Sequence, residues 1–388
     1  MKVLISLMYY RPHYSGLTIY TERLARALAG RGHQVTVLTS RFDPTLPPNE
    51  VRDGVTVIRP RVLMRISKGV IMPTLPYWAW KLIAQADVVN AHAPQPDAAV
   101  VTSISRLLGK PMLLTYHCDL RLPTGFIHYL ANRGSHLANH ISAQLANIIV
   151  TNSLDYAKNS PFLSRYLDKV HAIPPPIHLE SVTEKDVEKF RSKYNLLPNQ
   201  RIIGMAARLA TEKGVEYLVE ALPQVLKKYP TARVLFAGQH QNVLGEELYA
   251  QKLAPMFQEQ GEHWTFLGIL PPLEWSVFFH EAEVTVLPSI NSTESYGMVQ
   301  VESMTCGTPV VVSDLPGVRQ PVKSTGMGLI VPPQDSNNLA RALISILDKP
   351  NGYNGNIDEI TNHYAPETIA MEYEGLFEQL IDERGDRT

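Results

Sequence analysis

Short apolar segments alternate with longer amphipathic segments along this chain of 388 residues, and the series runs twice. The apolar segments of the first series fall at residues 2–7, 34–40, 55–58, 87–91, 112–115 and 147–151. Strands that alternate with helical segments are typical of a parallel sheet with helices on both faces. We therefore predict an α/β fold with a doubly wound parallel sheet for the first half of the chain.

Three successive prolines separate the two series. Residues 172–177 read AIPPPI, which cannot continue a helix or a central strand and suits a stiff connector between domains. The apolar segments of the second series fall at residues 201–206, 233–237, 265–267, 284–287, 309–313 and 328–331. The chain is also too long for one ordinary core. We predict two Rossmann-like domains, residues 1–173 and 178–365, that face a central cleft.

The composition gives information on the possible partners of the protein and on its cellular compartment. A formal net charge of -1 gives no indication of a nucleic-acid partner. Cys118 and Cys306 are too few for a disulfide framework and match no metal-ligand spacing, so we expect two small buried thiols in a reducing compartment. The N-terminus does not resemble a signal peptide, and no apolar run is long enough to span a membrane. We predict a cytoplasmic protein, with a peripheral position at the inner face of the membrane left open.

The stretch at residues 288–312 follows an apolar run and contains a polar loop, a helical segment and a second apolar run. The loop carries Glu294, and the helical segment that starts near Gly297 carries Glu302. A strand-to-helix loop brings backbone N–H groups and the positive end of a helix to the carboxyl edge of a sheet. Open α/β sheets bind ligands at that edge, so this stretch is a candidate binding site.

The spacing of the two glutamates bears on the class of reaction. If the whole interval were helical, the carboxylates would lie about 12 Å apart, whereas the pair of a glycosidase lies roughly 5–10 Å apart. Glu294 and Glu302 therefore favour binding of two hydroxyl-bearing parts of one long ligand. The alternative is structural, with Glu302 on a solvated helix face and Glu294 as a helix cap.

Two cations follow the first strand of the second series. Arg208 and Lys213 precede a helical segment whose first turn is near Gly214. Cations beside a helix N-terminus form an anion site, and a diphosphate is a suitable ligand. The alternative is that both are ordinary surface residues.

The first half of the chain offers two weaker signals. His117 directly follows an apolar strand, where reacting groups gather, although a lone histidine is more often structural. Ser15 and Gly16 allow the backbone to approach a ligand closely, and a plain turn is the alternative. The opening β-α-β pattern is that of a Rossmann unit but lacks G-x-G-x-x-G, which argues against a nicotinamide oxidoreductase.

Together, these residues resemble a known family. The R-x4-K pair (Arg208, Lys213) with E-x7-E (Glu294, Glu302) resembles the retaining GT-B glycosyltransferases of family four, or glycosyl transferases group 1. The segment ESYGMVQVESMTCGTPVV resembles that family's E-[small]-[F/Y]-G-…-E-A-M-…-G-x-P-V-V signature, and GMAARLATEKGVEYLVEAL, RVLFAGQ and FLGILP agree with it. The likeness spans nearly the whole chain. It implies an acceptor-binding first domain, a donor-binding second domain, and a C-terminal helix of about 366–388 that packs back on the first.

The resemblance also implies roles for single residues. Arg208 and Lys213 would bind the diphosphate of a nucleotide-sugar donor and neutralise the charge of the departing group. Glu302 would bind the ribose, and Glu294 would hold hydroxyls of the transferred sugar together with backbone amides near Gly297. The positions assigned to the donor are Gly16, Arg208, Lys213, Leu267, Gly268, Glu294, Tyr296, Gly297, Met298 and Glu302, and those assigned to catalysis are His117, Arg208, Lys213 and Glu294.

The implied activity is transfer of a hexose from a UDP- or GDP-sugar to a hydroxyl acceptor, with retention and without a bound metal. A lipid-linked compound and a glycan are both candidate acceptors, and no cofactor beyond the donor is expected. The sequence has no Asp-x-Asp pair or His/Asp cluster that would suggest a metal site. Two alternatives stay open: a nucleotide-sugar 2-epimerase of the same two-domain plan, and a nucleotide-sugar-binding regulator without activity.

A basic and aromatic segment in the first half leaves two interpretations open, one of which is membrane contact. The basic residues are Arg59, Arg61, Arg65 and Lys68, and the aromatic ones are Tyr77, Trp78 and Trp80. Basic residues beside exposed aromatic rings are suited to an anionic membrane or a lipid-linked acceptor. The alternative is a surface loop followed by a helix whose tryptophans are buried.

Overall fold

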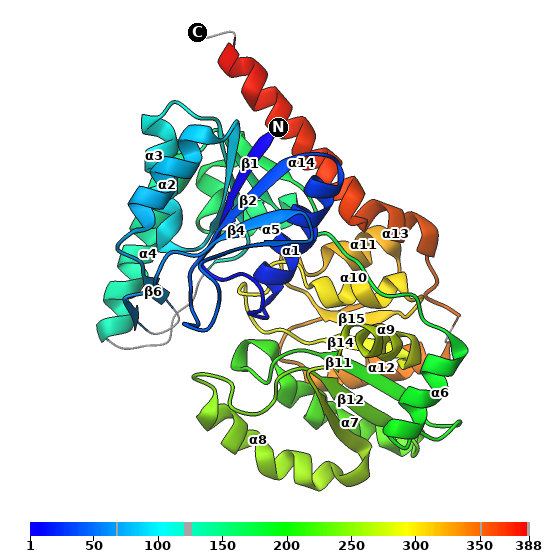
Figure 1. Ribbon diagram of the computed structural model, residues 1–388. Coiled ribbons are helices and arrows are strands. Elements are labelled where there is room, and N and C mark those ends of the chain that lie inside the picture. Colours follow the sequence, from blue (N-terminus) through cyan, green and yellow to red (C-terminus); the bar gives the residue numbers. More distant parts are fainter. Residues whose placement is uncertain (67–68, 120–125, 350, 386–388) are drawn as a thin grey trace. The chain divides into compact units, whose positions relative to one another are not determined.

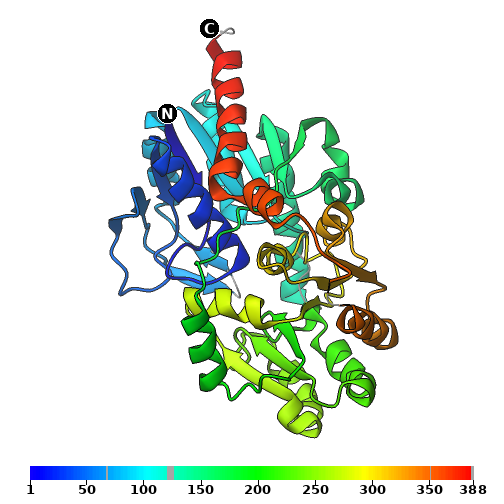
Figure 2. The same cartoon turned by 90° about the vertical axis from the view of Figure 1, so that its right-hand side faces the viewer.

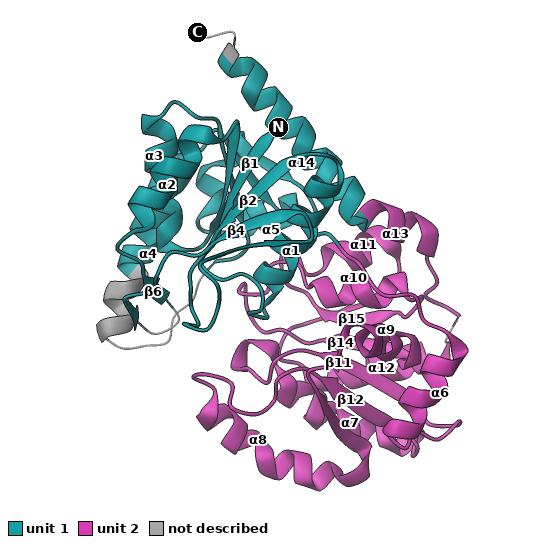
Figure 3. Ribbon diagram, viewed as in Figure 1, with its two compact units in different colours: residues 1–176, 364–388 teal, residues 177–363 magenta. Residues whose placement is uncertain are grey.

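The two halves of the chain form separate compact units. The computed structural model describes residues 1–66, 69–119, 126–349 and 351–385. Its contacts divide the chain into unit 1, Met1–Pro176 with Tyr364–Thr388, and unit 2, Ile177–His363 (Figure 3). The chain thus leaves unit 1 inside the AIPPPI segment, and its last helix belongs with the first half.

Unit 1 is built on a mostly parallel sheet. Its described strands are β1 (Lys2–Ser6), β2 (Gln34–Leu38), β3 (Asn49–Arg52), β4 (Val55–Ile58), β5 (Met64–Ile66), β6 (Gly69–Ile71), β7 (Val88–Ala93), β8 (Met112–Tyr116), β9 (Ile148–Thr151) and β10 (Val170–Ala172). The order in the main sheet is β10-β9-β8-β7-β1-β2-β4-β3, and only the edge strand β3 pairs antiparallel. β5 and β6 form a separate antiparallel hairpin.

Helices cover both faces of this sheet. The described α-helices are α1 (Gly16–Gly30), α2 (Leu75–Gln85), α3 (Pro96–Leu107), α4 (Phe126–Leu145), α5 (Leu154–Asn159) and α14 (Pro366–Gly385). α2, α3 and α4 pack side by side on one face, and α1 packs against α14 on the other (Figures 1 and 2). α1 buries Tyr20, Leu24 and Leu28, whose four-residue spacing places them on one side of the helix.

Unit 2 contains a fully parallel sheet. Its described strands are β11 (Ile202–Ala206), β12 (Arg233–Ala237), β13 (Trp264–Gly268), β14 (Val284–Leu287), β15 (Val310–Ser313) and β16 (Gly328–Val331), in the order β13-β12-β11-β14-β15-β16. The α-helices are α6 (Glu184–Lys193), α7 (Val215–Lys228), α8 (Glu247–Gln260), α9 (Pro272–Glu281), α10 (Met298–Thr305), α11 (Gln320–Thr325), α12 (Ser336–Asp348) and α13 (Ile357–Tyr364). The predicted Rossmann-like α/β architecture is confirmed in both units.

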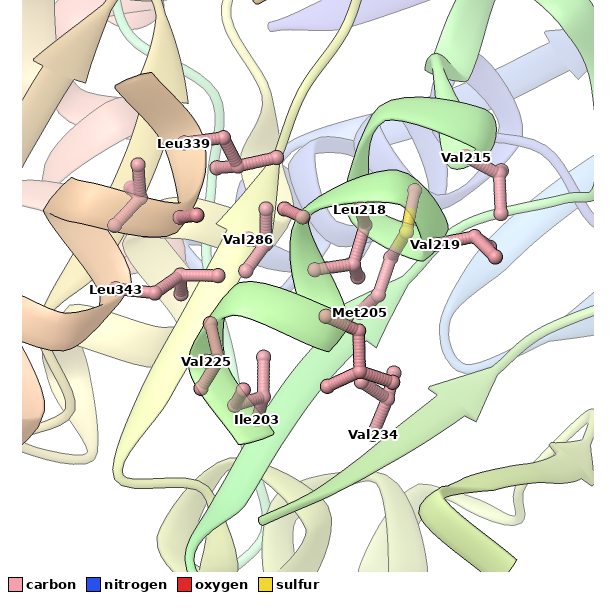
Figure 4. Close-up of a cluster of buried hydrophobic side chains, with 14 of the residues drawn as sticks. Ile203, Met205, Val215, Leu218, Val219, Val225, Val234, Val286, Leu339 and Leu343 are labelled. Carbon is pink, nitrogen blue, oxygen red and sulfur yellow. The ribbon is translucent and has the colours of Figure 1, made fainter. Parts of the chain in front are cut away.

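A dry core joins the unit 2 sheet to two of its helices (Figure 4). Ile203 of β11 and Val286 of β14 lie in one cluster with Leu218 of α7 and Leu343 of α12, and all four side chains are almost completely buried. Burying an aliphatic side chain of this size contributes about 1.5–3 kcal/mol. This packing fixes the position from which the loops at the end of each strand leave the sheet.

Each sheet has one point at which the strand order reverses. In unit 2 the chain builds outward from β11 through β12 to β13 and then returns to place β14 on the other side of β11. In unit 1 the corresponding pair is β1 and β7. Open α/β sheets bind ligands outside the carboxyl ends of the strands at such a point. The residues that follow β1, β7, β11 and β14 are therefore the first places to search for a site.

A chain of buried hydrogen bonds ties α14 to unit 1. The hydroxyl groups of Tyr20 and Tyr373 lie 2.8 Å apart, Tyr373 lies 3.0 Å from Thr115 Oγ1, and Thr115 donates to Asn90 Oδ1 at 2.9 Å. Because the Thr115 proton goes to Asn90, Tyr373 donates to Thr115 and Tyr20 donates to Tyr373. The C-terminal helix thus supplies a hydrogen-bond acceptor inside the core of the unit formed by the first half.

Replacing Tyr373 with phenylalanine should destabilise unit 1 by about 1–3 kcal/mol, because the buried Tyr20 hydroxyl loses its acceptor. Native-state hydrogen exchange of amides in β8 and α1 measures the change. The control is Tyr77→Phe, because Tyr77 is 62% exposed and its replacement should leave the exchange unchanged. Equal protection in Tyr373→Phe and the wild type would contradict a role for this chain of hydrogen bonds in holding α14.

Candidate functional site

Two loops of unit 2 meet at the carboxyl ends of β11 and β14. The amide of Ile290 donates to the carbonyl of Glu212 at 3.1 Å. Gly214 has a φ of +63°, and a Cβ there would lie 2.2 Å from the carbonyl oxygen of Pro288. Only glycine fits both constraints. The turn that leads into α7 is therefore held directly against the loop that leads into α10.

These loops bring Lys213 and Glu294 into contact. Lys213 Nζ donates to Glu294 Oε2 at 2.6 Å, and the two side chains are 21% and 15% exposed. Arg208 also follows β11 but is 47% exposed and donates to Glu212 at 3.1 Å. Lys213, Glu294 and Arg208 were all predicted as site residues from the sequence, but the contact between Lys213 and Glu294 was not. Lys213 is not an ordinary surface lysine, whereas the exposure of Arg208 fits either interpretation.

The helices α7 and α10 both begin at a glycine. Gly214 and Gly297, with φ values of +63° and +79°, occupy the N-cap positions and carry no side chain to cap the first turn. The partial positive charges of two helix termini are therefore turned to the edge where Lys213 lies, although the first N–H of α7, that of Val215, already donates to the Tyr249 hydroxyl at 3.1 Å. The interpretation of Glu294 as a helix cap is wrong, because α10 starts at Met298 and the Glu294 carboxylate pairs with Lys213. The edge suits an anionic ligand.

Glu302 is buried rather than solvated. The residue is only 3% exposed, and Oε2 of its carboxylate accepts a hydrogen bond from Trp275 Nε1 at 3.1 Å. The solvated-face interpretation is therefore wrong. Because α10 begins at Met298, the interval from Glu294 to Glu302 is not one helix, and the helical separation of about 12 Å does not apply. The carboxylate has the capacity to accept further hydrogen bonds.

Other predicted donor positions lie at the same sheet edge. Leu267 and Gly268 end β13, two strands from β11, and Gly268 accepts a hydrogen bond from the amide of Gly238 at 2.8 Å. Tyr296 is buried at 4% exposure in the loop that leads into α10. The ends of three strands thus contribute to one edge of unit 2.

The two cysteines are half-buried rather than fully buried. Burial and the neighbouring Glu302 raise the pKa of the Cys306 thiol to about 12, so it stays protonated near neutral pH. Within the described residues, no group of three or more His, Cys, Asp or Glu side chains is placed to hold a metal ion.

In unit 1, His117 contacts a second buried histidine. His117 follows β8, and its Nε2 lies 2.8 Å from Nδ1 of His92 in β7. Burial lowers the pKa of His117 to about 3, and burial with the neighbouring ring lowers the pKa of His92 well below its usual value. Both rings are therefore neutral near pH 7. His92 was not among the residues predicted from the sequence, although a histidine inside the apolar strand VVNAHA was a signal of it.

The first loop of unit 1 supports α1. Ser15 is the N-cap of this helix, since its Oγ accepts a hydrogen bond from the amide of Thr18 at 3.2 Å, and Gly16 is the first helical residue.

Asp97, which follows β7, was not predicted from the sequence either. One oxygen of its carboxylate is enclosed without a hydrogen-bond partner, and burial raises the pKa of Asp97 to about 6. The carboxyl edge of this sheet therefore carries His117, Gly16 and Asp97.

The basic and aromatic segment is only partly available for contact. Arg59 is buried at 2% exposure and forms an ion pair with Glu50, so it does not belong to a surface patch. Arg61 and Arg65 are exposed, Trp80 is 50% exposed and Trp78 is half-buried, while Lys68 lies outside the described residues. The interpretation with both tryptophans buried is therefore wrong. Across the described ranges, no helix combines the length and apolar character needed to cross a membrane.

Several solved structures share the fold of this chain. Sucrose-phosphate synthase from Thermosynechococcus elongatus superposes with a TM-score of 0.75 at 22% identity, over 98% of this chain and 99% of the other. HepE of Anabaena, in complex with UDP, gives a TM-score of 0.75 at 19% identity, over 98% and 100% of the two chains. Two Rossmann-like units of this kind define the GT-B fold of glycosyltransferases.

Sequence comparisons identify the family. The model of glycosyl transferases group 1 matches residues 186–363, and that of glycosyltransferase family 4 matches residues 14–181. A D-inositol 3-phosphate glycosyltransferase of Acidothermus cellulolyticus is 27% identical over 86% of this chain and 78% of its own. An uncharacterized glycosyltransferase of Methanocaldococcus jannaschii is 25% identical over 89% of both chains. The protein is a glycosyltransferase, and it belongs to the family 4, group 1 glycosyltransferases.

The close approach at Gly214 makes a prediction about stability. Gly214→Ala should destabilise unit 2 by about 1–3 kcal/mol beyond the cost of backbone strain, because the new Cβ overlaps a backbone oxygen that cannot rotate away. The matched control is Gly326→Ala, which has a similar φ of +72° and no atom within 4 Å of the added Cβ. The stability of unit 2 should fall by only about 1–2 kcal/mol in this control. Hydrogen exchange of amides in β11 and β14 measures both, and equal losses would contradict a tight contact between the two loops.

Proposed function

We propose that the protein transfers a hexose, with retention, from a nucleotide-diphosphate sugar to a hydroxyl acceptor without a bound metal ion. The observation that carries the proposal is the Lys213–Glu294 contact at the strand-order reversal of unit 2, beside two helix N-termini. Structures of Anabaena HepE, which shares the fold, are described with UDP and with UDP-glucose. Relatives named D-inositol 3-phosphate glycosyltransferase and phosphatidyl-myo-inositol mannosyltransferase support sugar transfer to a hydroxyl.

The cations and the helix termini meet the main electrostatic demand of the reaction. A nucleoside diphosphate leaves with negative charge, and Arg208 and Lys213 stabilise that charge. The exposed guanidinium of Arg208 moves easily from Glu212 to a phosphate oxygen, because its present pairing is solvent-screened. The N–H groups at the start of α10 and the positive end of the α7 dipole add stabilisation that needs no reorganisation. Gly16 of unit 1 allows close backbone approach to the same diphosphate.

The carboxylates bind the two sugars of the donor. Glu294 accepts hydrogen bonds from hydroxyls of the transferred hexose while its other contact keeps Lys213 in place. The backbone at Tyr296, Gly297 and Met298 adds donors to the same sugar. Glu302, held by Trp275, accepts from the ribose hydroxyls.

The base and the acceptor take the remaining positions. We assign the backbone at Leu267 and Gly268 to the base and His117 of unit 1 to the transferred sugar. The acceptor oxygen attacks the anomeric carbon on the face from which the diphosphate departs. The carbon–oxygen bond to phosphate breaks, the bond to the acceptor forms, and the acceptor proton passes to a phosphate oxygen. Retention of the anomeric configuration follows from this same-face displacement.

Incubation with UDP- and GDP-sugars, followed by NMR of the anomeric proton, tests the reaction. Transfer, or slow release of free sugar, with the configuration of the donor supports the proposal. A product of inverted configuration would overturn the retaining mechanism. Conversion of the donor to its 2-epimer would instead show an epimerase, and binding without turnover would show a regulator.

The role of Lys213 can be measured separately. Lys213→Met should lower kcat/KM roughly 10²–10³-fold, a loss typical of removing one group that stabilises the charge of a transition state. Lys227→Met on the exposed surface of α7 is the matched control and should leave the rate unchanged. Because Lys213→Met also leaves Glu294 unpaired, the double variant Lys213→Met/Glu294→Gln should be no more active. Full activity in Lys213→Met would contradict the assignment.

The exposed part of the basic and aromatic segment suits a lipid-linked acceptor. Arg61 and Arg65 supply positive charge. Trp80 and Tyr77 supply amphipathic rings, and Tyr77 is 62% exposed. This combination binds the interface of an anionic bilayer. We therefore extend the proposal to a peripheral membrane contact through Arg61, Arg65, Lys68, Trp78 and Trp80.

Replacing Arg61, Arg65 and Lys68 with serine should abolish binding to vesicles that contain anionic lipid, because each basic residue near the surface contributes about 1 kcal/mol. Co-sedimentation measures the binding, and added salt should weaken it in the wild type. A charge-matched control replaces Lys185, Lys189 and Lys227 of unit 2 with serine and should bind normally. Unchanged binding of the first variant would refute this segment as the anchor.

A further inference from the structure

The pair His92 and His117 has a geometry that determines where the protons lie. Nδ1 of His92 and Nε2 of His117 are 2.8 Å apart, and the two ring planes differ by only 20°. The ring centroids lie 5.0 Å apart, which together with the short N–N distance places the rings edge to edge, so the N–H of one ring points along the lone pair of the other. His92 is completely buried in β7, and His117 is 9% exposed at the carboxyl end of β8. The contact is thus a hydrogen bond between neutral rings, and one ring must be the donor.

Thr21 indicates which ring donates. Its Oγ1 lies 3.3 Å from Nδ1 of His92 and donates its single proton to the carbonyl of Leu17 at 2.9 Å. With its proton committed, the hydroxyl offers only lone pairs to His92. Nδ1 of His92 therefore carries a hydrogen, which it shares between Thr21 and His117.

The other nitrogen of His92 supports the same assignment. Nε2 of His92 is enclosed and has no hydrogen-bond partner among the described residues. An enclosed N–H without an acceptor is rarer in proteins than an acceptor that lacks a donor. A proton on Nδ1 leaves only a lone pair at Nε2, so this tautomer carries the smaller penalty.

The tautomer of His117 follows from that of His92. Nε2 of His117 accepts the hydrogen bond, so a neutral His117 must carry its proton on Nδ1. Within the described ranges, that Nδ1 has no side-chain or carbonyl hydrogen-bond partner. The ring is also fixed from the side, since the edge-on ring of Tyr20 lies 4.9 Å away.

We propose that His92 is a positioning residue that holds His117 as the Nδ1–H tautomer, so that His117 presents a neutral hydrogen-bond donor to an oxygen atom of the sugar substrate. His117 then acts neither as a general base nor as a cation, because Nδ1 is protonated and the lone pair of Nε2 is occupied. The tautomer stands on the geometry of unit 1 alone. Its effect on transfer rests on the proposed function.

Long-range nitrogen–proton NMR of the imidazole rings tests the tautomer in the intact protein without substrate. We expect both rings to show a protonated Nδ1 and an unprotonated Nε2 at pH 7, with signals assigned by the loss of each in His92→Asn and His117→Asn. A protonated Nε2 on His117 would overturn the proposal. This readout holds whether or not the protein transfers sugar.

Two variants of His92 separate positioning from packing. The amide nitrogen of asparagine can replace Nδ1 as a donor, so His92→Asn should keep the His117 tautomer and most of kcat. His92→Leu fills the space without a donor, so His117 should show a mixture of tautomers and kcat should fall about 10–100-fold, as when other supporting hydrogen bonds are removed. KM for the acceptor should change less than kcat.

The outcomes of these variants are distinct. Equal losses of kcat in His92→Asn and His92→Leu, with an unchanged His117 tautomer in both, would show a purely structural role and overturn the proposal. A tautomer change in His92→Leu alone supports it, even if that protein is too unstable for kinetics. If no donor is turned over by the wild type, the proposed function fails while the NMR result still decides the tautomer.

Discussion

The pairing of β11 with β14 is the constraint on which the unit 2 site depends. These strands are neighbours in the sheet although about 80 residues separate them in the chain, and their loops leave at the same edge. The absence of a side chain at Gly214 lets the loops touch, and the contact between Lys213 and Glu294 follows. The same arrangement turns two helix N-termini toward that edge. Strand order and backbone contacts alone therefore determine the position of a site suited to a charged diphosphate.

Much of this architecture could be predicted from the sequence. The bounds of β4, β12, β14 and β16 agree with the predicted segments, because each is a continuous apolar run. The short edge strand β3, the hairpin of β5 and β6, and the small helices α11 and α13 gave no such pattern and were missed. They depend on tertiary pairing rather than on periodicity. The Lys213–Glu294 contact was also beyond reach, since local spacing says nothing of partners so far apart.

Unit 1 shows what periodicity cannot reveal about a core. Asn90, His92 and Thr115 lie inside strands that otherwise read as apolar, and each is buried with a hydrogen bond. A buried polar group without a partner costs more than its hydrogen bond returns, so the whole network must form together. Tyr373 closes the chain of hydrogen bonds through Thr115 and Asn90 from the other end of the sequence. The last helix therefore fixes Tyr20, whose ring packs edge-on against His117, as well as covering the sheet.

The central claim is that Lys213 is part of a diphosphate site in unit 2, and nucleotide binding tests it. A ligand that binds only the folded state raises the free energy of unfolding by mass action, by about 2.7 kcal/mol when the ligand concentration is 100 times the Kd. Thermal unfolding with UDP and with GDP should show a shift of several degrees with the preferred nucleotide, and most of that shift should be lost in Lys213→Met but kept in Lys227→Met. Equal shifts in all three proteins, or none in the wild type, would contradict a diphosphate site at Lys213.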